Sequence, residues 1–204
     1  MTRVPGALLL ATLIFSAGSA SAQPTGTTAF FAPYRAFGAH EFGGTLSFPE
    51  GGGVAAEGLY GFGSGRFDVG LRGGFWKPDN TDARILVGVS VRQRVIEHTE
   101  SFPLDGAVVA GLGGQFVDWT RILVPVGLSM GRRLDVEDSE VSIVPYLQPT
   151  VFLSYTDTDA GSDTDLGFSL GIGGDFRLSS MLDARVSVGI GDIEGISISA
   201  VWLR

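Results

Sequence analysis

Apolar and small or polar residues alternate with a period of two over long stretches of this 204-residue chain, and this pattern limits the fold more than any other feature. From 166 to 178 the even positions are apolar apart from one glycine, whereas the odd positions are Gly, Ser, Asp or Arg. Side chains of a β-strand point alternately to opposite faces, so this stretch predicts a strand whose two faces meet different surroundings.

The same alternation recurs along the chain, with turn-forming residues between the repeats. It predicts ten strands, near residues 42–48, 54–62, 66–76, 84–95, 105–116, 120–132, 141–155, 165–178, 183–191 and 196–203. We found no longer internal duplication and no linker that would divide this region into domains. Eight strands remain the alternative, if two of the candidates fuse or fail.

The first 22 residues have the features of a secretory signal peptide. Arg3 supplies the positive charge, residues 7–15 supply an apolar core, and Ala20-Ser21-Ala22 supplies the small residues of a cleavage site. We therefore expect an exported protein. Its expected divisions are a signal peptide at 1–22, an N-terminal lead-in at 23–41 and a β-barrel at 42–204.

Alternation fits both a soluble barrel, whose apolar face points inward, and an outer-membrane barrel, whose apolar face points to lipid. Several predicted strands run 11 to 14 residues, whereas soluble strands average about 5 to 6 and a bilayer needs about 9 to 11. The other face is rich in Gly and Ser, with isolated Arg and Asp. These features favour an all-β fold, a single antiparallel up-and-down transmembrane β-barrel.

Small residues suit the inner face of a narrow barrel, where Arg can pair with carboxylates through its planar fork. The charged residues that we expect to form a structural network in the lumen are Glu57, Arg66, Asp68, Arg72, Arg84, Arg92, Arg94, Asp105, Arg121, Asp165, Asp175, Arg177, Asp183 and Arg185. Aromatic residues near strand ends are typical of the girdles at the two membrane interfaces. The expected girdle residues are Phe42, Phe48, Phe67, Phe75, Phe168, Phe176 and Trp202.

Composition excludes several classes of protein. The formal net charge of -8 and the presence of a single Lys leave no basic surface for nucleic acid. The absence of Cys excludes disulfide and thiolate-metal scaffolds. The aspartates at 157, 159, 163 and 165 lack the spacing of an EF-hand, and they fit a solvated loop better than a cation site. We expect no cofactor and no metal.

Through its signal peptide, its alternation and its Gly-rich face, the region 42–204 resembles the small outer-membrane β-barrel proteins of Gram-negative-type bacteria, the opacity-protein and porin-like superfamily. The resemblance implies a place in the cell outer membrane, contact with outer-membrane lipid and insertion by the barrel assembly machinery. In that family the last strand usually ends on an aromatic residue, whereas here Trp202 is followed by Leu203 and Arg204.

The function we predict is that of a non-enzymatic integral outer-membrane barrel, monomeric, with a charge-filled narrow lumen and a structural or surface-interaction role. No surface ligand is indicated. The alternatives are a soluble periplasmic β-barrel that binds a lipid-like ligand through Phe168, Phe176 and Leu170, a narrow diffusion pore, and a lipid A-modifying enzyme. For the enzyme, a lipid A deacylase of this architecture has its His and Ser two residues apart, whereas His98 and Ser101 are three apart in a turn. We therefore expect no catalytic residue.

Overall fold

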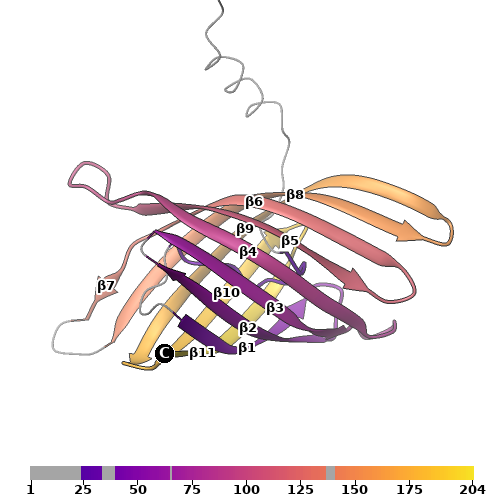
Figure 1. Cartoon of the computed structure of the whole chain (residues 1–204), viewed down its shortest axis with the longest axis horizontal. Helices are drawn as coiled ribbons and strands as arrows, with labels where there is room; N and C mark the ends of the chain where they lie inside the picture. Colours follow the sequence, from indigo (N-terminus) through magenta and orange to yellow (C-terminus); the bar gives the residue numbers. More distant parts are fainter. Residues whose placement is uncertain (1–23, 34–39, 65, 137–140) are drawn as a thin grey trace, which may run out of the picture.

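The computed structural model describes residues 24–33, 40–64, 66–136 and 141–204, and the expected signal peptide at 1–22 lies outside these residues. The described chain is built from β-strands (Figure 1). They are β1 (His40–Pro49), β2 (Val54–Ser64), β3 (Phe67–Lys77), β4 (Arg84–Ile96), β5 (Asp105–Phe116), β6 (Thr120–Gly131), β7 (Leu134–Asp135), β8 (Ser142–Thr158), β9 (Gly161–Ser179), β10 (Leu182–Gly191) and β11 (Gly195–Leu203). Over the described ranges, no helix is long and apolar enough to cross a membrane.

Ten of these strands close into an antiparallel barrel. Each pairs with its neighbour in the chain, β6 pairs with β8, and β1 pairs with β11 to complete the ring. The prediction of a closed ten-strand barrel is confirmed. The short strand β7, which pairs only with β8, was not predicted. The first strand begins at His40, so His40 and Glu41 of the expected lead-in belong to the barrel wall.

The hairpin connections give the barrel two rims. We call the end where β1 begins at His40 and β11 ends at Leu203 the terminal rim. The opposite end, where β1 ends at Pro49 and β11 begins at Gly195, is the far rim. The positions of residues along the barrel are given below relative to these two rims.

The hairpin of β8 and β9 projects beyond the far rim. Pairing of β9 with β10 ends at Ser169 and Gly191, whereas pairing of β9 with β8 continues to Gly161 and Thr158. The extension is the orange hairpin on the right of Figure 1. Its tip is the part of the described barrel that reaches furthest into solvent on this side.

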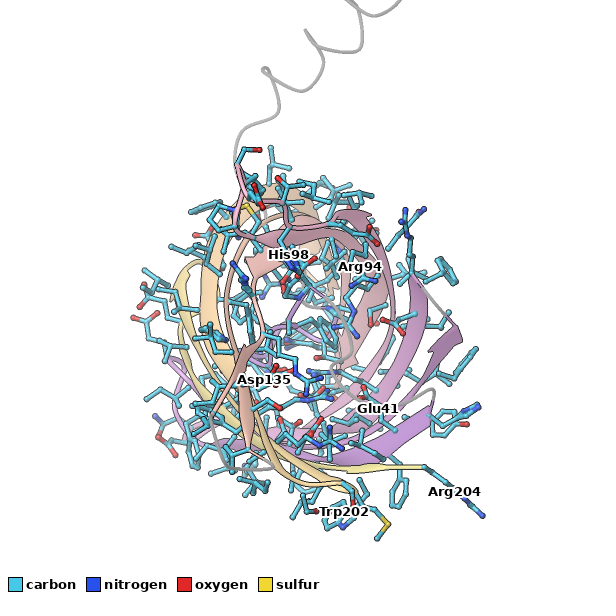
Figure 2. All side chains as sticks on the ribbon, turned by 90° about the vertical axis from the view of Figure 1, so that its left-hand side faces the viewer. Glu41, Arg94, His98, Asp135, Trp202 and Arg204 are labelled. Carbon is cyan, nitrogen blue, oxygen red and sulfur yellow. The ribbon has the colours of Figure 1, made fainter. Side chains whose placement is uncertain are left out.

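The apolar face of the sheet points outward and the polar face points into the lumen. On β11, Ile198 is 53% exposed, whereas its neighbour Ser197 is 1% exposed. Figure 2, a view toward the terminal rim, shows Glu41 inside the ring and Trp202 outside it. The soluble-barrel alternative is therefore wrong, because Phe168 and Leu170, which would line its cavity, lie on the outward-facing side of β9.

Residues 24–33 lie within the barrel. We call them the lumen segment. Thr25, Thr27, Thr28 and Ala32 are each 0% exposed, although the segment forms no strand and belongs to no ladder of the sheet. The sequence predicted a lead-in at this position, and it did not predict that the lead-in would occupy the lumen.

Candidate functional site: the lumen

The lumen is the candidate site because the strands direct their polar and small residues into it. Ser, Thr, Gln and charged side chains are buried there, among them Ser47, Gln115, Gln148, Ser169 and Ser187. A buried polar group loses its bonds to water, so it needs partners within the protein. The barrel supplies these partners in two ways, through the lumen segment and through ion pairs between strands.

The lumen segment is bound by side chains from several strands. Its backbone accepts hydrogen bonds through Thr25 O from Gln115 Nε2 (3.1 Å), through Thr28 O from the Oγ atoms of Ser187 (2.6 Å) and Ser197 (3.1 Å), and through Phe31 O from Ser129 Oγ. The amides of Phe30 and Phe31 donate to Ser187 Oγ and to Gln148 Oε1, at 3.2 and 2.9 Å. Thr27 donates its hydroxyl hydrogen to Glu57 at 2.7 Å. The backbone of the segment is therefore hydrogen-bonded without a strand ladder.

Two aromatic rings anchor the segment. Phe30 packs with Ala32, Val144 and Tyr146 in a small apolar cluster inside the lumen. The ring of Phe31 lies under two guanidinium groups, those of Arg72 at 5.0 Å and Arg92 at 5.9 Å from its centroid. A cation over the face of an aromatic ring is attracted by the ring quadrupole, more strongly where water is excluded. The segment thus fits both the apolar and the charged parts of the lumen.

Arg185 is the centre of an acidic cluster near the terminal rim. It donates to both carboxylate oxygens of Glu41, at 3.3 and 2.5 Å. Its guanidinium also lies 3.5 Å from Asp175 and 3.6 Å from Asp183. Both of these aspartates are buried. One cation therefore pairs with three carboxylates.

Two more ion pairs join neighbouring strands on the inner face of the barrel, Arg92 with Asp68 between β4 and β3 and Arg72 with Glu57 between β3 and β2. Arg92 contacts Asp68 through Nε and Nη2, at 3.0 and 2.9 Å, and donates from Nη1 to the carbonyl oxygen of Ala32 at 2.6 Å. Arg72 lies 3.9 Å from Glu57. Arg92 therefore joins the strand network to the lumen segment.

The remaining members of the expected lumen set lie nearer the rims or in solvent. Arg121 donates to Ser154 Oγ (2.9 Å), Arg177 to the carbonyl oxygen of Ser179 (3.3 Å), and buried Asp105 accepts from His98. Arg66, whose side chain is 64% exposed, pairs with Glu97 together with Arg94. Asp165 is exposed on the β8–β9 extension. Arg66 and Asp165 are thus solvent-exposed and lie outside the closed interior.

Arg84 forms a contact that the sequence did not reveal. Its guanidinium lies between two indole rings, 4.5 Å from the centroid of Trp76 and 4.7 Å from that of Trp119. It also donates to Gln115 Oε1 at 3.2 Å. Trp76 lies near the end of β3 and Trp119 in the turn between β5 and β6, so the pairing of the strands brings both to Arg84 at the start of β4.

The expected girdle residues lie on the outer face near the strand ends. Those that are at least 39% exposed are Phe42, Phe48, Phe67, Phe75, Phe168 and Trp202. Phe176 is partly buried. Near the terminal rim, Phe42 and Trp202 stack at 6.1 Å between centroids across the β1–β11 pair. Additional exposed rings, Tyr60, Phe62, Phe116 and Tyr155, extend the two bands.

His98 has a carboxylate partner that its place in a turn did not indicate. Its Nδ1 lies 3.1 Å from Asp105 Oδ2, and its backbone amide donates to Oδ1 at 3.2 Å. The hydroxyl of Ser101 lies 3.1 Å from that of Thr99. An Asp–His pair positions an imidazole, but a hydrolase also requires a nucleophile within hydrogen-bonding reach of that imidazole. The aspartates at 157, 159, 163 and 165 are exposed, and among the described residues no group of His, Cys, Asp and Glu has a metal-binding arrangement.

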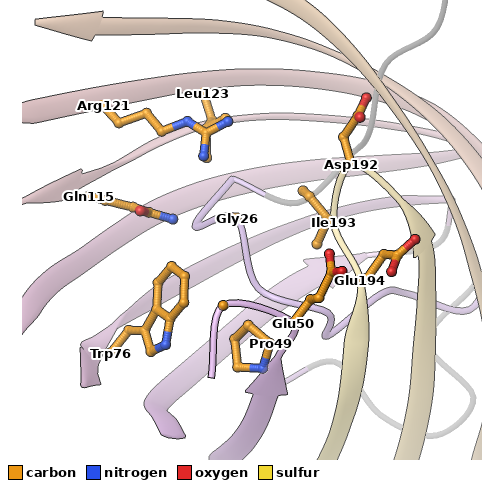
Figure 3. A pocket seen from close by; sticks show the side chains of 11 residues that line it. Gly26, Pro49, Glu50, Trp76, Gln115, Arg121, Leu123, Asp192, Ile193 and Glu194 are labelled. Carbon is orange, nitrogen blue, oxygen red and sulfur yellow. The ribbon is translucent and has the colours of Figure 1, made fainter. Parts of the chain in front are cut away.

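An open pocket of about 110 Å³ lies at the far rim (Figure 3). Its lining includes Trp76, Gln115, Arg121 and Asp192 from the barrel, together with Gly26 of the lumen segment. Gly26 has a φ of +71°, and a Cβ there would lie 3.0 Å from Leu123. We call this pocket the vestibule. Within the lumen segment, Gly26 therefore lines the vestibule.

Comparison with known proteins gives weak similarities. No family model matches the sequence, and no curated protein matches it significantly. Among solved structures, a bacterial polysaccharide outer membrane secretin is 12% identical with a TM-score of 0.44, covering 81% of this chain and 65% of its own. Ail, the attachment invasion locus protein of Yersinia pestis, solved in complex with the heparin analogue sucrose octasulfate, is 12% identical with a TM-score of 0.31, covering 80% of this chain and 95% of its own.

The nature of the barrel follows from its own geometry. In a bilayer every backbone polar group must be paired within the protein, which only helices and closed barrels achieve. Here the ladder closes on itself, the outer face is apolar between aromatic bands, and the lumen is polar. A single-chain barrel with an even strand number and this arrangement is typical of bacterial outer membranes. The chain is a small outer-membrane β-barrel.

Proposed function

We propose that this protein is a non-enzymatic integral outer-membrane barrel whose role is structural, with a surface-interaction role for its projecting hairpin. The observation that carries the proposal is the filled lumen: the lumen segment and the ion pairs of Arg92 and Arg185 occupy the space that a channel or an active site would need. A packed interior stabilises the barrel and leaves the rims as the surfaces for contact with other molecules.

The filled lumen disfavours the narrow diffusion pore. A pore needs a continuous water path, and a barrel of about eight strands encloses a space that side chains can fill. Here residues 24–33 add a further length of chain to that space, bound to strands on several sides. We therefore propose that the lumen is closed to solutes while residues 24–33 occupy it.

The pair of His98 and Asp105 is the observation that keeps a lipid-modifying enzyme as the second candidate. It lies at the terminal rim, where a lipid headgroup could reach it. Against this reading, the hydroxyl of Ser101 is hydrogen-bonded to Thr99. We propose a structural role for the pair, in which Asp105 fixes the turn that follows β4.

The surface role is proposed for the β8–β9 hairpin. Its tip extends past the far rim and carries exposed aspartates at positions 157, 159 and 163. A negatively charged tip would repel anionic surfaces and suit a cationic partner. The proposed partners of the whole barrel are outer-membrane lipid around its belt and the barrel assembly machinery during insertion, and the protein is proposed to act as a monomer.

The test is membrane fractionation of cells that produce the full chain, followed by electrophoresis of boiled and unboiled samples and by current measurements in planar lipid bilayers. We expect the protein in the outer-membrane fraction, a mobility that changes on boiling, and no steady current. A soluble periplasmic protein without such a change would contradict the membrane role. A large steady current from the full chain would replace the structural role with that of a pore.

A further inference from the structure

The lumen segment is held in the barrel without any strand pairing. Strands of the barrel are joined by continuous ladders, whereas residues 24–33 are bound by separate hydrogen bonds to side chains of β2, β4, β5, β6, β8, β10 and β11. Its departure would therefore break no strand pair. The barrel wall, which supplies the membrane-spanning structure, is complete without it.

The wall is shaped to receive the segment. A Cβ at Gly171 of β9 would overlap the ring of Phe30. At Gly88 of β4 a Cβ would lie 2.9 Å from Pro24. Such distances are shorter than ordinary van der Waals contact, so side chains at these positions would exclude the segment. These glycines therefore leave the space that the lumen segment occupies.

The groups that the segment would leave behind are polar. Gln115, Gln148, Ser129 and Ser187 each bond to its backbone, and Arg92 bonds to its Ala32 carbonyl. Water can replace a peptide backbone at such groups, because each can bond to water where space permits. An emptied lumen would therefore hydrate. At the far rim, Gly26 of the segment already lines the open vestibule.

From these observations we propose that the lumen is a binding channel for a short peptide segment, that residues 24–33 are its built-in occupant, and that release of this occupant opens a water path through the barrel. The proposal rests on the membrane role above and goes beyond it, since it assigns the lumen a ligand class and the protein an open state. The recognised ligand is a short, uncharged segment whose two aromatic rings fill the Phe30 and Phe31 positions.

The first test is deletion of residues 24–33 from the full chain, with current measured across planar bilayers. The proposal predicts that the variant still shows the boiling-dependent mobility of a folded barrel and gains a current that the full chain lacks. A synthetic peptide with the sequence of residues 24–33 should then suppress that current, and a scrambled peptide should not. A folded but non-conducting deletion variant would overturn the proposal, because the ion pairs alone would then close the lumen.

A second variant keeps the test decisive if the deletion prevents folding. Gly171→Val retains the whole chain but removes the space for the Phe30 ring, and Gly44→Val is its control, because a Cβ at Gly44 meets nothing closer than 3.8 Å. Because the chain has no Cys, an added Ala29→Cys reports whether the segment is seated. Ala29 is 3% exposed, so its thiol should react with a polar maleimide only in the Gly171→Val background.

The labelling and the current must agree. Labelling together with current in Gly171→Val, and neither in Gly44→Val, is the expected result. A folded Gly171→Val variant that stays unlabelled, or that is labelled without gaining current, would overturn the inference. If the parent chain lacks boiling-dependent mobility, the membrane role itself fails. The two failures are thus distinguishable.

Discussion

At the residue scale, the lumen is organised by arginines that each serve more than one partner. Arg185 contacts Glu41, Asp175 and Asp183, and its side chain is 12% exposed. Removing one partner of a buried ion pair leaves charge without compensation, which costs far more than loss of an exposed pair. The arginines should therefore contribute unequally to the free energy of unfolding.

Arg185→Met should lower the free energy of unfolding by about 3 to 5 kcal/mol, because three buried carboxylates lose their common cation. The matched control is Arg66→Met, whose pair with Glu97 is solvent-exposed and should contribute no more than about 1 kcal/mol. Urea titration of the boiling-dependent mobility in lipid vesicles measures both. Equal effects of the two substitutions would contradict the buried cluster.

Ser169→Leu tests how tightly the interior is packed. Ser169 is 0% exposed, and its Oγ accepts a hydrogen bond from the amide of Ile193 at 2.8 Å. A larger side chain should overpack the lumen and cost about 1 to 3 kcal/mol, with further loss from the unpaired amide. Ala200→Leu enlarges an outward-facing position of β11 and should be nearly neutral. Unimpaired folding of Ser169→Leu in the same urea titration would argue against a filled lumen.

At the scale of the element, each strand has one face toward the surrounding lipid and the other toward the lumen. Val186 of β10 is 38% exposed on the outer face, and its neighbours on the two adjacent strands, Ile198 and Gly174, lie well inside their ladders. Ile190 of the same strand is 50% exposed near the far rim. The two positions therefore share a face but differ in depth within the membrane.

Val186→Arg should destabilise the folded barrel by about 2 to 4 kcal/mol, because its charge would lie near the bilayer midplane, whereas Ile190→Arg should cost about 0 to 1 kcal/mol near the interface. Folding yields and urea midpoints in vesicles of defined composition compare the two variants. In a protein that does not cross a membrane, depth would not matter and the two effects would show no such order.

At the scale of the whole molecule, the barrel depends on a single long-range closure. Strands β1 and β11, from opposite ends of the barrel sequence, pair from Glu41–Leu203 to Pro49–Gly195. Inside this seam, the hydroxyls of Thr45 and Ser199 lie 2.8 Å apart. Without this seam both strands would expose unpaired amides and carbonyls to lipid, which is prohibitively costly.

Thr45→Cys with Ser199→Cys should form a disulfide in the folded protein, because paired positions on neighbouring strands fall within the Cα separation that a disulfide requires. The crosslink would cyclise most of the chain and stabilise it by up to about 5 kcal/mol. Non-reducing electrophoresis of the denatured protein detects the cyclised form by its altered mobility. Thr45→Cys with Gln148→Cys, on strands that do not pair, is the control and should not crosslink.

The sequence by itself determined the strands and their faces. Period-two alternation is a local property, because a strand presents successive side chains to opposite sides whatever it pairs with. The ten predicted strands therefore lie close to the observed ones, from β1 (His40–Pro49) to β11 (Gly195–Leu203). The aromatic bands and most of the inward charges follow from the same alternation. The exposure of Arg66 and Asp165 does not follow from the alternation, because it depends on where each strand extends beyond the rim of the barrel.

Only the tertiary structure decided which groups meet. The contacts of Arg185 with Glu41 and of Arg84 with Trp76 and Trp119 depend on barrel register and closure, which alternation leaves open. The lumen segment has no strand period, and its one visible signal is that no charge occurs between the expected cleavage site and Arg35. Its burial exists only because ten strands surround it, so no local pattern could encode that place.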